Sequence, residues 1–377
     1  LMRSRDVEAT IIGKFTDSGR CVVKYKGKKI MDIDMEFLHN GLPKLQLQTS
    51  QTYIKHFEPD LKFERPTSEL EKLFGSKNVA GFAFISEQYD HEVQAGSVLK
   101  PLAGRGKINT EAQVFAPVLN SPKGVVLTSS TYPSYGDLNT YDMAAAAIDT
   151  AVRNAVVAGG TLSHLALLDN FCWSSSGDPV RLGQLVDAVR ACYDTAVAYG
   201  TPFISGKDSM WNDFKGFDAN GKPVKISALP TLLISALGVI PDVTKTVTED
   251  LKNSGDLVYL LNFKLLNFKR YYQAVQKNLI ASAISIGRGG IEVALAKSAM
   301  AGMIGIEVSS ALGGSGIIVS IKPENKKAFE KIMKENSIKL IGTVSDDTTI
   351  VVKSERNIIR LPVAEALKAY KSTFKNY

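Results

Sequence analysis

The alternation of strand-like and helix-like segments between residues 124 and 240 constrains the fold of this 377-residue chain most strongly. A helix is predicted over residues 141–158, where apolar residues recur at helical spacing and two glycines follow. A second helix is predicted from Asp178, which is a suitable N-cap, to Gly200, which ends it. Short apolar runs typical of buried strands surround these helices, at residues 124–129, 164–168, 202–204 and 229–240. The pattern predicts an α/β or α+β domain.

Further units flank this domain. Residues 1–45 contain three alternating segments typical of a small antiparallel meander, at 7–12, 20–25 and 29–33. Such a meander is too short to bury a core by itself, so it must pack against another part of the protein. We predict a linker at 46–66, where Gln, Thr and Pro are frequent, followed by one domain at 67–245 and another α/β domain at 246–377.

Composition excludes several classes of protein. The net charge of +7 comes with dispersed lysines and no basic patch interleaved with aromatic residues, so we expect no nucleic-acid partner. No apolar run approaches the roughly 18 residues of a membrane span, and no signal peptide opens the chain, so we expect no membrane association. The three widely spaced cysteines are typical of reduced thiols and favour a cytoplasmic location.

The run Gly206-Lys207-Asp208-Ser209 has an unusual density of polar groups directly after a short apolar segment. We therefore expect a turn at the carboxyl edge of a sheet, where α/β proteins tend to bind ligands. Gly206 would let the backbone approach a ligand, while Lys207 and Ser209 would contact phosphate. The run is not a Walker A loop, because Thr201 and Asp208 replace the glycine and the hydroxyl residue of that motif. A solvated polar turn is the alternative interpretation.

Polar residues also concentrate in four other segments of the same domain. These four segments lie at residues 89–101, 132–137, 149–154 and 168–173. With the run at residues 206–213 they make five polar segments. In this order and spacing they resemble the second half of the phosphoribosylformylglycinamidine synthase family, and the pair L-D-N-F-C-W and G-K-D-S-M is the most specific match. Residues 3–43 look like the end of the first half of that family, and residues 361–370 look like its C-terminus. The resemblance therefore covers the whole chain.

The resemblance implies an aminoimidazole-ribonucleotide-synthetase-like fold. Each unit of this type has an N-terminal domain, whose sheet pairs across a pseudo-dimer, and a C-terminal α/β domain. The family joins two such units, of which one holds the active nucleotide site and the other a relic that often holds ADP. It converts formylglycinamide ribonucleotide, ATP and glutamine-derived ammonia into formylglycinamidine ribonucleotide, ADP and phosphate, a reaction in which positioning and charge stabilisation by magnesium dominate.

The resemblance also implies site residues. It places metal ligands at Glu111 and Asn154 and no catalytic residue in this half, because the catalytic histidine segment of the first half is absent. The chain alone is therefore expected to be inactive. The residues implied in substrate or nucleotide binding are Asp90, Lys100, Tyr135, Asp137, Asp169, Asn170, Gly206, Lys207, Asp208 and Ser209.

Departures from the family pattern affect the metal site. Thr150 replaces a glutamate one helical turn before Asn154, and Lys207 replaces a magnesium-binding asparagine. Residues 284–290 have lost both aspartates of the family motif His-Asp-x-Ser-Asp-Gly-Gly. Because magnesium prefers several carboxylate oxygens, we expect the auxiliary ADP–magnesium site to be weak or empty. ATP, ADP and Mg²⁺ are thus cofactors of the parent enzyme and doubtful for this half alone.

The implied partners are the catalytic first half and a glutaminase subunit or domain, and a homodimer through the N-terminal sheet is a further pairing. Two roles stay open. The chain either lends residues 206–209 and 132–137 to an active site completed by the first half, or it is a structural half that scaffolds the catalytic one. Another superfamily enzyme, such as aminoimidazole ribonucleotide synthetase or selenophosphate synthetase, is the runner-up, against which the two specific runs argue.

Overall fold

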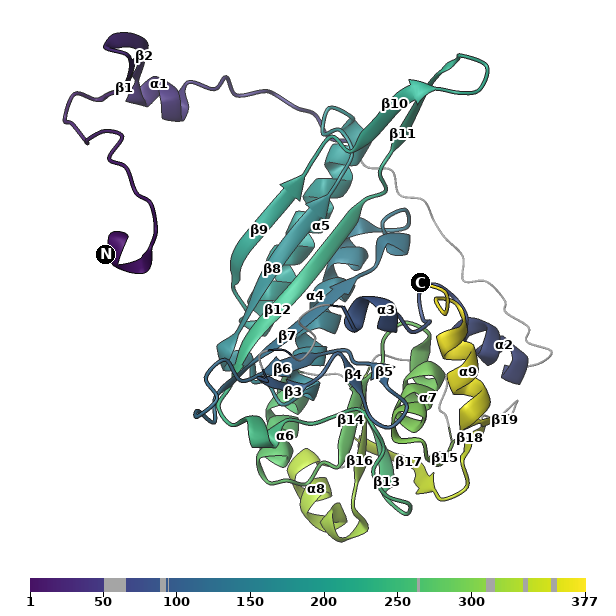
Figure 1. Cartoon of the computed structure of the whole chain (residues 1–377). Coiled ribbons are helices and arrows are strands. Elements are labelled where there is room, and N and C mark those ends of the chain that lie inside the picture. Colours follow the sequence, from purple (N-terminus) through teal and green to yellow (C-terminus); the bar gives the residue numbers. More distant parts are fainter. Residues whose placement is uncertain are drawn as a thin grey trace. The chain divides into compact units, whose positions relative to one another are not determined.

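The computed structural model describes residues 1–50, 66–88, 93, 95–262, 265–309, 316–334, 338–353 and 358–377. These residues form two compact units, Leu1–Gln48 and Thr49–Tyr377, which are described separately. Figure 1 shows the elements of both units. The predicted linker lies mostly outside the described residues, and the boundary between the domains 67–245 and 246–377 stays a prediction.

The first unit is a hairpin followed by a short helix. Its elements are η1 (Arg3–Arg5), β1 (Arg20–Tyr25), β2 (Lys28–Asp34) and α1 (Met35–Asn40). The third predicted strand, at residues 7–12, is wrong: this segment has no strand partner, and Ile11 and Ile12 are almost fully exposed. The unit buries no side chain, so nothing within it provides the apolar face that would hold a third strand in place.

The second unit begins with a mixed six-stranded sheet in the order β3-β6-β7-β12-β8-β9. Neighbouring strands are antiparallel, except that β8 and β9 are parallel. The two most extensive pairings are those of β12 with β7 and with β8, and β9 is an edge strand. The strands are β3 (Ser97–Leu99), β6 (Gln113–Phe115), β7 (Gly124–Thr131), β8 (Leu165–Cys172), β9 (Phe203–Ser209) and β12 (Thr231–Ile240).

The two long predicted helices are confirmed as α4 (Thr140–Val157) and α5 (Pro179–Tyr199). Asp178 caps α5 through the backbone N–H groups of Val180 and Arg181, and Gly200 ends it in the left-handed conformation, with φ of 69°. Helix α4 packs on β7 and β12, and α5 packs on α4 (Figure 1). On the strand positions that face away from these helices, Leu127 and Val239 are about 40% exposed.

The remainder of the second unit is built on a seven-stranded sheet in the order β14-β16-β13-β17-β15-β18-β19. Strand β16 is buried at every residue because helices cover both faces of this sheet (Figure 1). The strands are β13 (Leu257–Asn262), β14 (Ser282–Ser285), β15 (Gly305–Ser309), β16 (Gly316–Ile321), β17 (Ile338–Ser345), β18 (Thr349–Lys353) and β19 (Ile358–Pro362). The helices are α2 (Pro66–Phe74), α6 (Leu265–Gln276), α7 (Gly290–Gly302), α8 (Lys326–Met333) and α9 (Val363–Ser372).

One hydrophobic core joins the two sheets. It combines apolar residues of α4 with Phe268 and Tyr271 of α6 and Val319 of β16. The hydroxyl of Tyr271 donates to the carbonyl of Val157, at the end of α4, over 2.8 Å. The junction between α4 and the second sheet is therefore fixed by packing, and two clefts of this unit lie along it.

Shorter elements complete this unit. They are α3 (Ala83–Ser86), β4 (Leu102–Ala103), β5 (Ile108–Asn109), η2 (Pro133–Tyr135), η3 (Leu162–His164), β10 (Asp213–Phe217), β11 (Pro223–Ser227), η4 (Val243–Lys245) and η5 (Pro323–Asn325).

Candidate functional site

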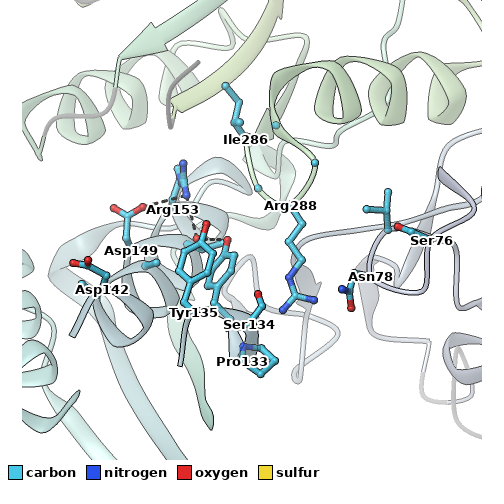
Figure 2. Close-up of a pocket in the computed structure, with 18 of the residues that line it drawn as sticks. Ser76, Asn78, Pro133, Ser134, Tyr135, Asp142, Asp149, Arg153, Ile286 and Arg288 are labelled. Atoms are coloured by element: carbon cyan, nitrogen blue, oxygen red, sulfur yellow. Dashed lines mark hydrogen bonds and ion pairs between the residues drawn. The ribbon is translucent and has the colours of Figure 1, made fainter. Parts of the chain in front are cut away.

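A cleft of about 970 Å³ lies between α4, the 3-10 turn η2 and the segment that leads into α7 (Figure 2). A smaller cavity of about 370 Å³ adjoins it and extends toward α7. Tyr132, Thr150 and Arg288 line both, so the two are neighbouring parts of one site. Concave sites with a few convergent polar groups are the usual places of ligand binding.

The wall formed by α4 carries a partly buried ion pair. Arg153 lies one helical turn after Asp149, and its guanidinium is 3.1 Å from the Asp149 carboxylate. Arg153 also donates to the hydroxyl of Thr150 over 3.1 Å, and the Tyr199 hydroxyl donates to Asp149 over 2.5 Å. Burial raises the pKa of Asp149, against the charge of Arg153 and the hydrogen bond from Tyr199. Sequence reasoning missed Arg153 as a site residue, although the i, i+4 spacing was a usable signal.

The facing wall is formed by Arg288 and two tyrosines. The guanidinium carbon of Arg288 lies 5.4 Å from the centre of the Tyr132 ring, and Arg288 donates to the carbonyl of Thr131. Tyr132 stacks on Tyr135 with ring centres 5.2 Å apart, and its hydroxyl is 2.9 Å from the hydroxyl of Thr150. Tyr135, a predicted binding residue, thus lines the cleft (Figure 2). Asp137 is exposed and is not part of either lining.

Glycines shape the segment between Arg288 and α7. Gly289 is the N-cap of α7 and has φ of 84°, which favours glycine. A Cβ at this position would also lie 2.4 Å from a methyl group of Val293. The tight turn therefore lies at the two glycines that this segment shares with the family motif, directly after the positions 285 and 288 where the motif has aspartates.

The smaller cavity contains both predicted metal ligands, each already engaged by a neighbouring side chain. Glu111 accepts a hydrogen bond from Lys297 in an ion pair, and Asn154 accepts one from Ser285 through its Oδ1. The backbone N–H of Glu111 donates to the buried Glu249 over 2.6 Å. Burial raises the pKa of Glu249 to about 8, although the charge of Lys297 opposes the shift. In the part of the chain that the structure describes, no group of three His, Cys, Asp or Glu residues could hold a metal ion.

The Gly206–Ser209 run lies in a strand, so the predicted turn is wrong. The run forms the end of β9, which pairs with β8 in parallel, with Gly206 opposite Asp169 and Lys207 opposite Asn170. Successive side chains of a strand point to opposite faces. Lys207 therefore shares a face with Ser209, and its ammonium donates to the Ser209 hydroxyl, while Asp208 faces the other way. The four residues do not surround a single phosphate.

Gly206 has a packing role in this strand pair. The carboxylate of Asp169 lies over it, and a Cβ at position 206 would be 2.6 Å from Asp169 Oδ1. Partial burial raises the pKa of Asp169, the backbone N–H of Lys207 lowers it by hydrogen bonding, and the charge of Asp208 raises it further. Asp169, Asn170 and the Gly206–Ser209 run thus form a polar cluster at an exposed sheet edge, apart from the cleft.

The other predicted binding residues lie elsewhere. Lys100 lines a separate cavity of about 450 Å³ with Lys107, Asp250 and Lys252. Asp90 lies outside the described residues. The structure therefore distributes the predicted residues over the cleft, the sheet edge and this third position. Sequence reasoning missed Glu249 and Lys297, and no local pattern pointed to them, because the groups they contact are distant in the chain.

Among the described residues, no helix is both long enough and apolar enough to span a bilayer.

The comparisons with known proteins bear on the class of this fold. No protein-family model matches the chain. The phosphoribosylformylglycinamidine synthase subunit PurL of Methanocaldococcus jannaschii is 27% identical, with 99% of this chain and 55% of the relative aligned. The same subunit of Thermococcus gammatolerans is 28% identical over 97% of this chain and 54% of its own length. The chain thus spans about half the length of the curated relatives it matches.

Solved structures show the same similarity in the fold. Thermotoga maritima PurL complexed with FGAR has a TM-score of 0.57 at 13% identity, covering 80% of this chain and 53% of that one. The structure of PurLQS from that organism has a TM-score of 0.53 at 20% identity, covering 88% and 49%. Further structures of that PurL are complexed with ATP, ADP or AMPPCP.

The mixed α+β architecture is that of the aminoimidazole-ribonucleotide-synthetase-like proteins, so the predicted fold class is confirmed. Within that class, the resemblance found in the sequence motifs is also confirmed: the chain is homologous, over nearly all its residues, to about half of the PurL subunit of phosphoribosylformylglycinamidine synthase.

Proposed function

We propose that this chain acts as one half of a phosphoribosylformylglycinamidine synthase in purine biosynthesis. In the whole enzyme, formylglycinamide ribonucleotide, ATP and glutamine-derived ammonia would give formylglycinamidine ribonucleotide, ADP and phosphate. The observation that carries the proposal is the alignment of 99% of the chain with about half of PurL. The cytoplasm is the proposed location, and the three free cysteines support it.

The chain alone is proposed to be inactive. Its cleft is lined by a carboxylate and a guanidinium that neutralise each other, Asp149 and Arg153. The described part of the site offers no cluster of carboxylates that would hold the magnesium required for phosphoryl transfer. The active nucleotide site would therefore belong to the other half, and ATP and Mg²⁺ would be cofactors of the complete enzyme.

The exposed cluster on β9 supports a contribution of this chain to that active site. Lys207 and Asp208 are exposed on an edge strand, where a partner chain can approach both their side chains and the backbone edge that no other described strand pairs with. A partner phosphate could meet Lys207 and Ser209 on one face of the strand. The chain would then contribute part of an active site that its partner completes.

The scaffold role is the second candidate, and the ion pair between Glu111 and Lys297 favours it. This pair occupies the implied metal position and makes the nucleotide site of this half degenerate. The chain would then only support the catalytic half through the sheet face that carries Leu127 and Val239. A glutaminase subunit is the further proposed partner, which the PurLQS structure of Thermotoga maritima supports.

Phosphate release tests the proposal and separates the two roles. The chain is mixed with a polypeptide that supplies the other half of the synthase, together with formylglycinamide ribonucleotide, ATP and ammonia. We expect no release from the chain alone and substrate-dependent release from the mixture. Ser209→Ala should lower this release at least about tenfold if β9 contributes to the site, since a phosphate contact would be lost. Ser205→Ala is the matched control, because Ser205 is exposed on the same face of β9.

Equal activity of the Ser209→Ala and Ser205→Ala mixtures would assign the scaffold role. Absence of substrate-dependent release from a mixture in which light scattering shows a stable complex would contradict the proposed reaction itself.

A further inference from the structure

The resemblance implies a magnesium site at Glu111 and Asn154, and the residues present do not fit one. Magnesium requires several oxygen ligands that converge in near-octahedral geometry. Here the Glu111 carboxylate is bound by the ammonium of Lys297, and the amide oxygen of Asn154 accepts from Ser285. Thr150, one helical turn before Asn154, contributes a hydroxyl that hydrogen-bonds with Tyr132 and Arg153.

Lys297 is a mostly buried residue in the wall of this cavity. It lies on α7, its side chain is only 11% exposed, and it lines the same cavity as Glu111 and Asn154. The buried Glu249 accepts a hydrogen bond from the backbone N–H of Glu111 and so lies beside this ion pair. One ammonium thus compensates the charge of the Glu111 carboxylate, which comes from a distant part of the chain, and this is the electrostatic role that a bound cation would otherwise have.

We propose that the ammonium of Lys297 takes the place of a divalent metal ion in this cavity, so that the site is organised without magnesium. The charge is carried on α7 itself, and the Glu111 carboxylate that could attract an ion is already paired with it. The inference deepens the proposed function and rests on it only for the expectation that a metal site stood here.

Four forms of the chain test the replacement directly: the unchanged protein, Thr150→Glu, Lys297→Met and the double variant. Thr150→Glu adds a carboxylate to the cavity lining, and Lys297→Met removes the ammonium while keeping a side chain of similar length. Magnesium and manganese are titrated by calorimetry, and folding is checked by circular dichroism. We expect no saturable binding to the unchanged protein and binding at least about tenfold tighter to the double variant than to Thr150→Glu, because only the double variant combines the added carboxylate with a Glu111 that is no longer paired with Lys297.

A matched control combines Thr150→Glu with Lys353→Met. Lys353 also pairs with a glutamate, Glu307, but both side chains are about half exposed and lie on the β15–β18 pair, so this combination should gain no metal affinity. Equal affinity of Thr150→Glu and the double variant would overturn the proposal, because Lys297 would then not compete with the metal. A folded double variant that binds no metal would overturn it as well.

The unchanged protein gives an answer even if the variants do not fold. The amplitude of the free Mn²⁺ signal in electron paramagnetic resonance is measured with and without the chain. An undiminished signal supports the replacement, whereas a loss of signal that Glu111→Gln abolishes contradicts it. These measurements need no partner and no turnover, so their failure would leave the proposed synthase function standing.

Discussion

Asp149 and Arg153 lie one turn apart on α4 and form a 3.1 Å ion pair in the wall of the cleft. The side chain of Arg153 is 3% exposed and that of Asp149 is 24% exposed, so the pair is shielded from solvent on one side and open to the cleft on the other. A charge in such a position depends on its partner, because water compensates it only in part.

Removal of the guanidinium should therefore destabilise the protein. We expect Arg153→Met to lower the free energy of unfolding by about 2 to 3 kcal/mol, somewhat below the range for fully buried pairs because Asp149 reaches the cleft. Urea denaturation measures the change. Arg190→Met is the control, because the side chain of Arg190 is 58% exposed where it pairs with Asp187 on α5, and its loss should cost no more than about 0.5 kcal/mol. Equal losses in the two variants would show that the pair has no special role.

The same pair predicts a pH dependence. The pKa of Asp149 in the folded protein is raised above its ordinary value, mainly by burial, so the folded state holds the proton more tightly than the unfolded chain. The stability contributed by this group is therefore present at low pH and is lost as the pH rises through the folded pKa. In Arg153→Met that pKa should rise further. We expect the stability difference between wild type and variant to be smaller at about pH 5 than at about pH 8. A pH-independent difference would contradict this explanation.

Gly289 and Gly287 provide a matched pair for the turn before α7. Gly289→Ala should cost about 2 kcal/mol or more, because φ of 84° strains any other residue and the new Cβ meets Val293. Gly287→Ala should be nearly neutral, since a Cβ there has no neighbour within 4 Å among the described residues. Thermal denaturation of the two variants compares them. A similar melting temperature for both would mean that the turn is not constrained as described.

The nucleotide affinity of the cleft is a separate prediction. Calorimetric titration of the isolated chain with Mg·ADP should show no tight binding, because the implied metal ligands are engaged by Lys297 and Ser285. Thermotoga maritima PurL, which has been solved with ADP, is a suitable positive control. A sub-micromolar dissociation constant for the chain would refute the prediction.

The face of the six-stranded sheet that points away from α4 should be an association surface. Leu127 and Val239 lie on neighbouring strands of this face and are 39% and 42% exposed. Replacing both by Ser should weaken pairing with the other half of the synthase, or self-association, by at least about tenfold, because apolar area would no longer be buried. Val186→Ser on α5 is a control of similar exposure, at 41%. Light scattering and titration of the partner give the measurement, and unchanged pairing of the double variant would exclude this face.

Local sequence signals predicted the long helices α4 and α5 well. Asp178, Pro179 and Gly200 define the ends of α5 by capping interactions within a few residues, and such interactions do not depend on the remainder of the fold. The sequence motifs also identified the fold class, because their order and spacing match those of the family that they resemble. The loss of carboxylates at residues 284–290 could likewise be seen without coordinates.

Two other features could not be predicted from the local sequence pattern. The segment at residues 7–12 has a strand-like pattern but no partner strand, and pattern alone does not supply one. The Gly206–Ser209 run has turn-like composition, yet its pairing with β8 holds it in a strand and separates Lys207 from Asp208 on opposite faces.

The sequence by itself thus determined the helix ends, the fold class and the departures from the metal motif, because each depends on neighbouring residues or on a spacing along the chain. Only the tertiary structure decided what occupies the position of the metal site that the resemblance implies. Lys297 and Glu111 are 186 positions apart and meet because α7 packs against the segment that follows β5. Charges that compensate each other across a folded core leave no local pattern, so their pairing appears only when the packing brings them together.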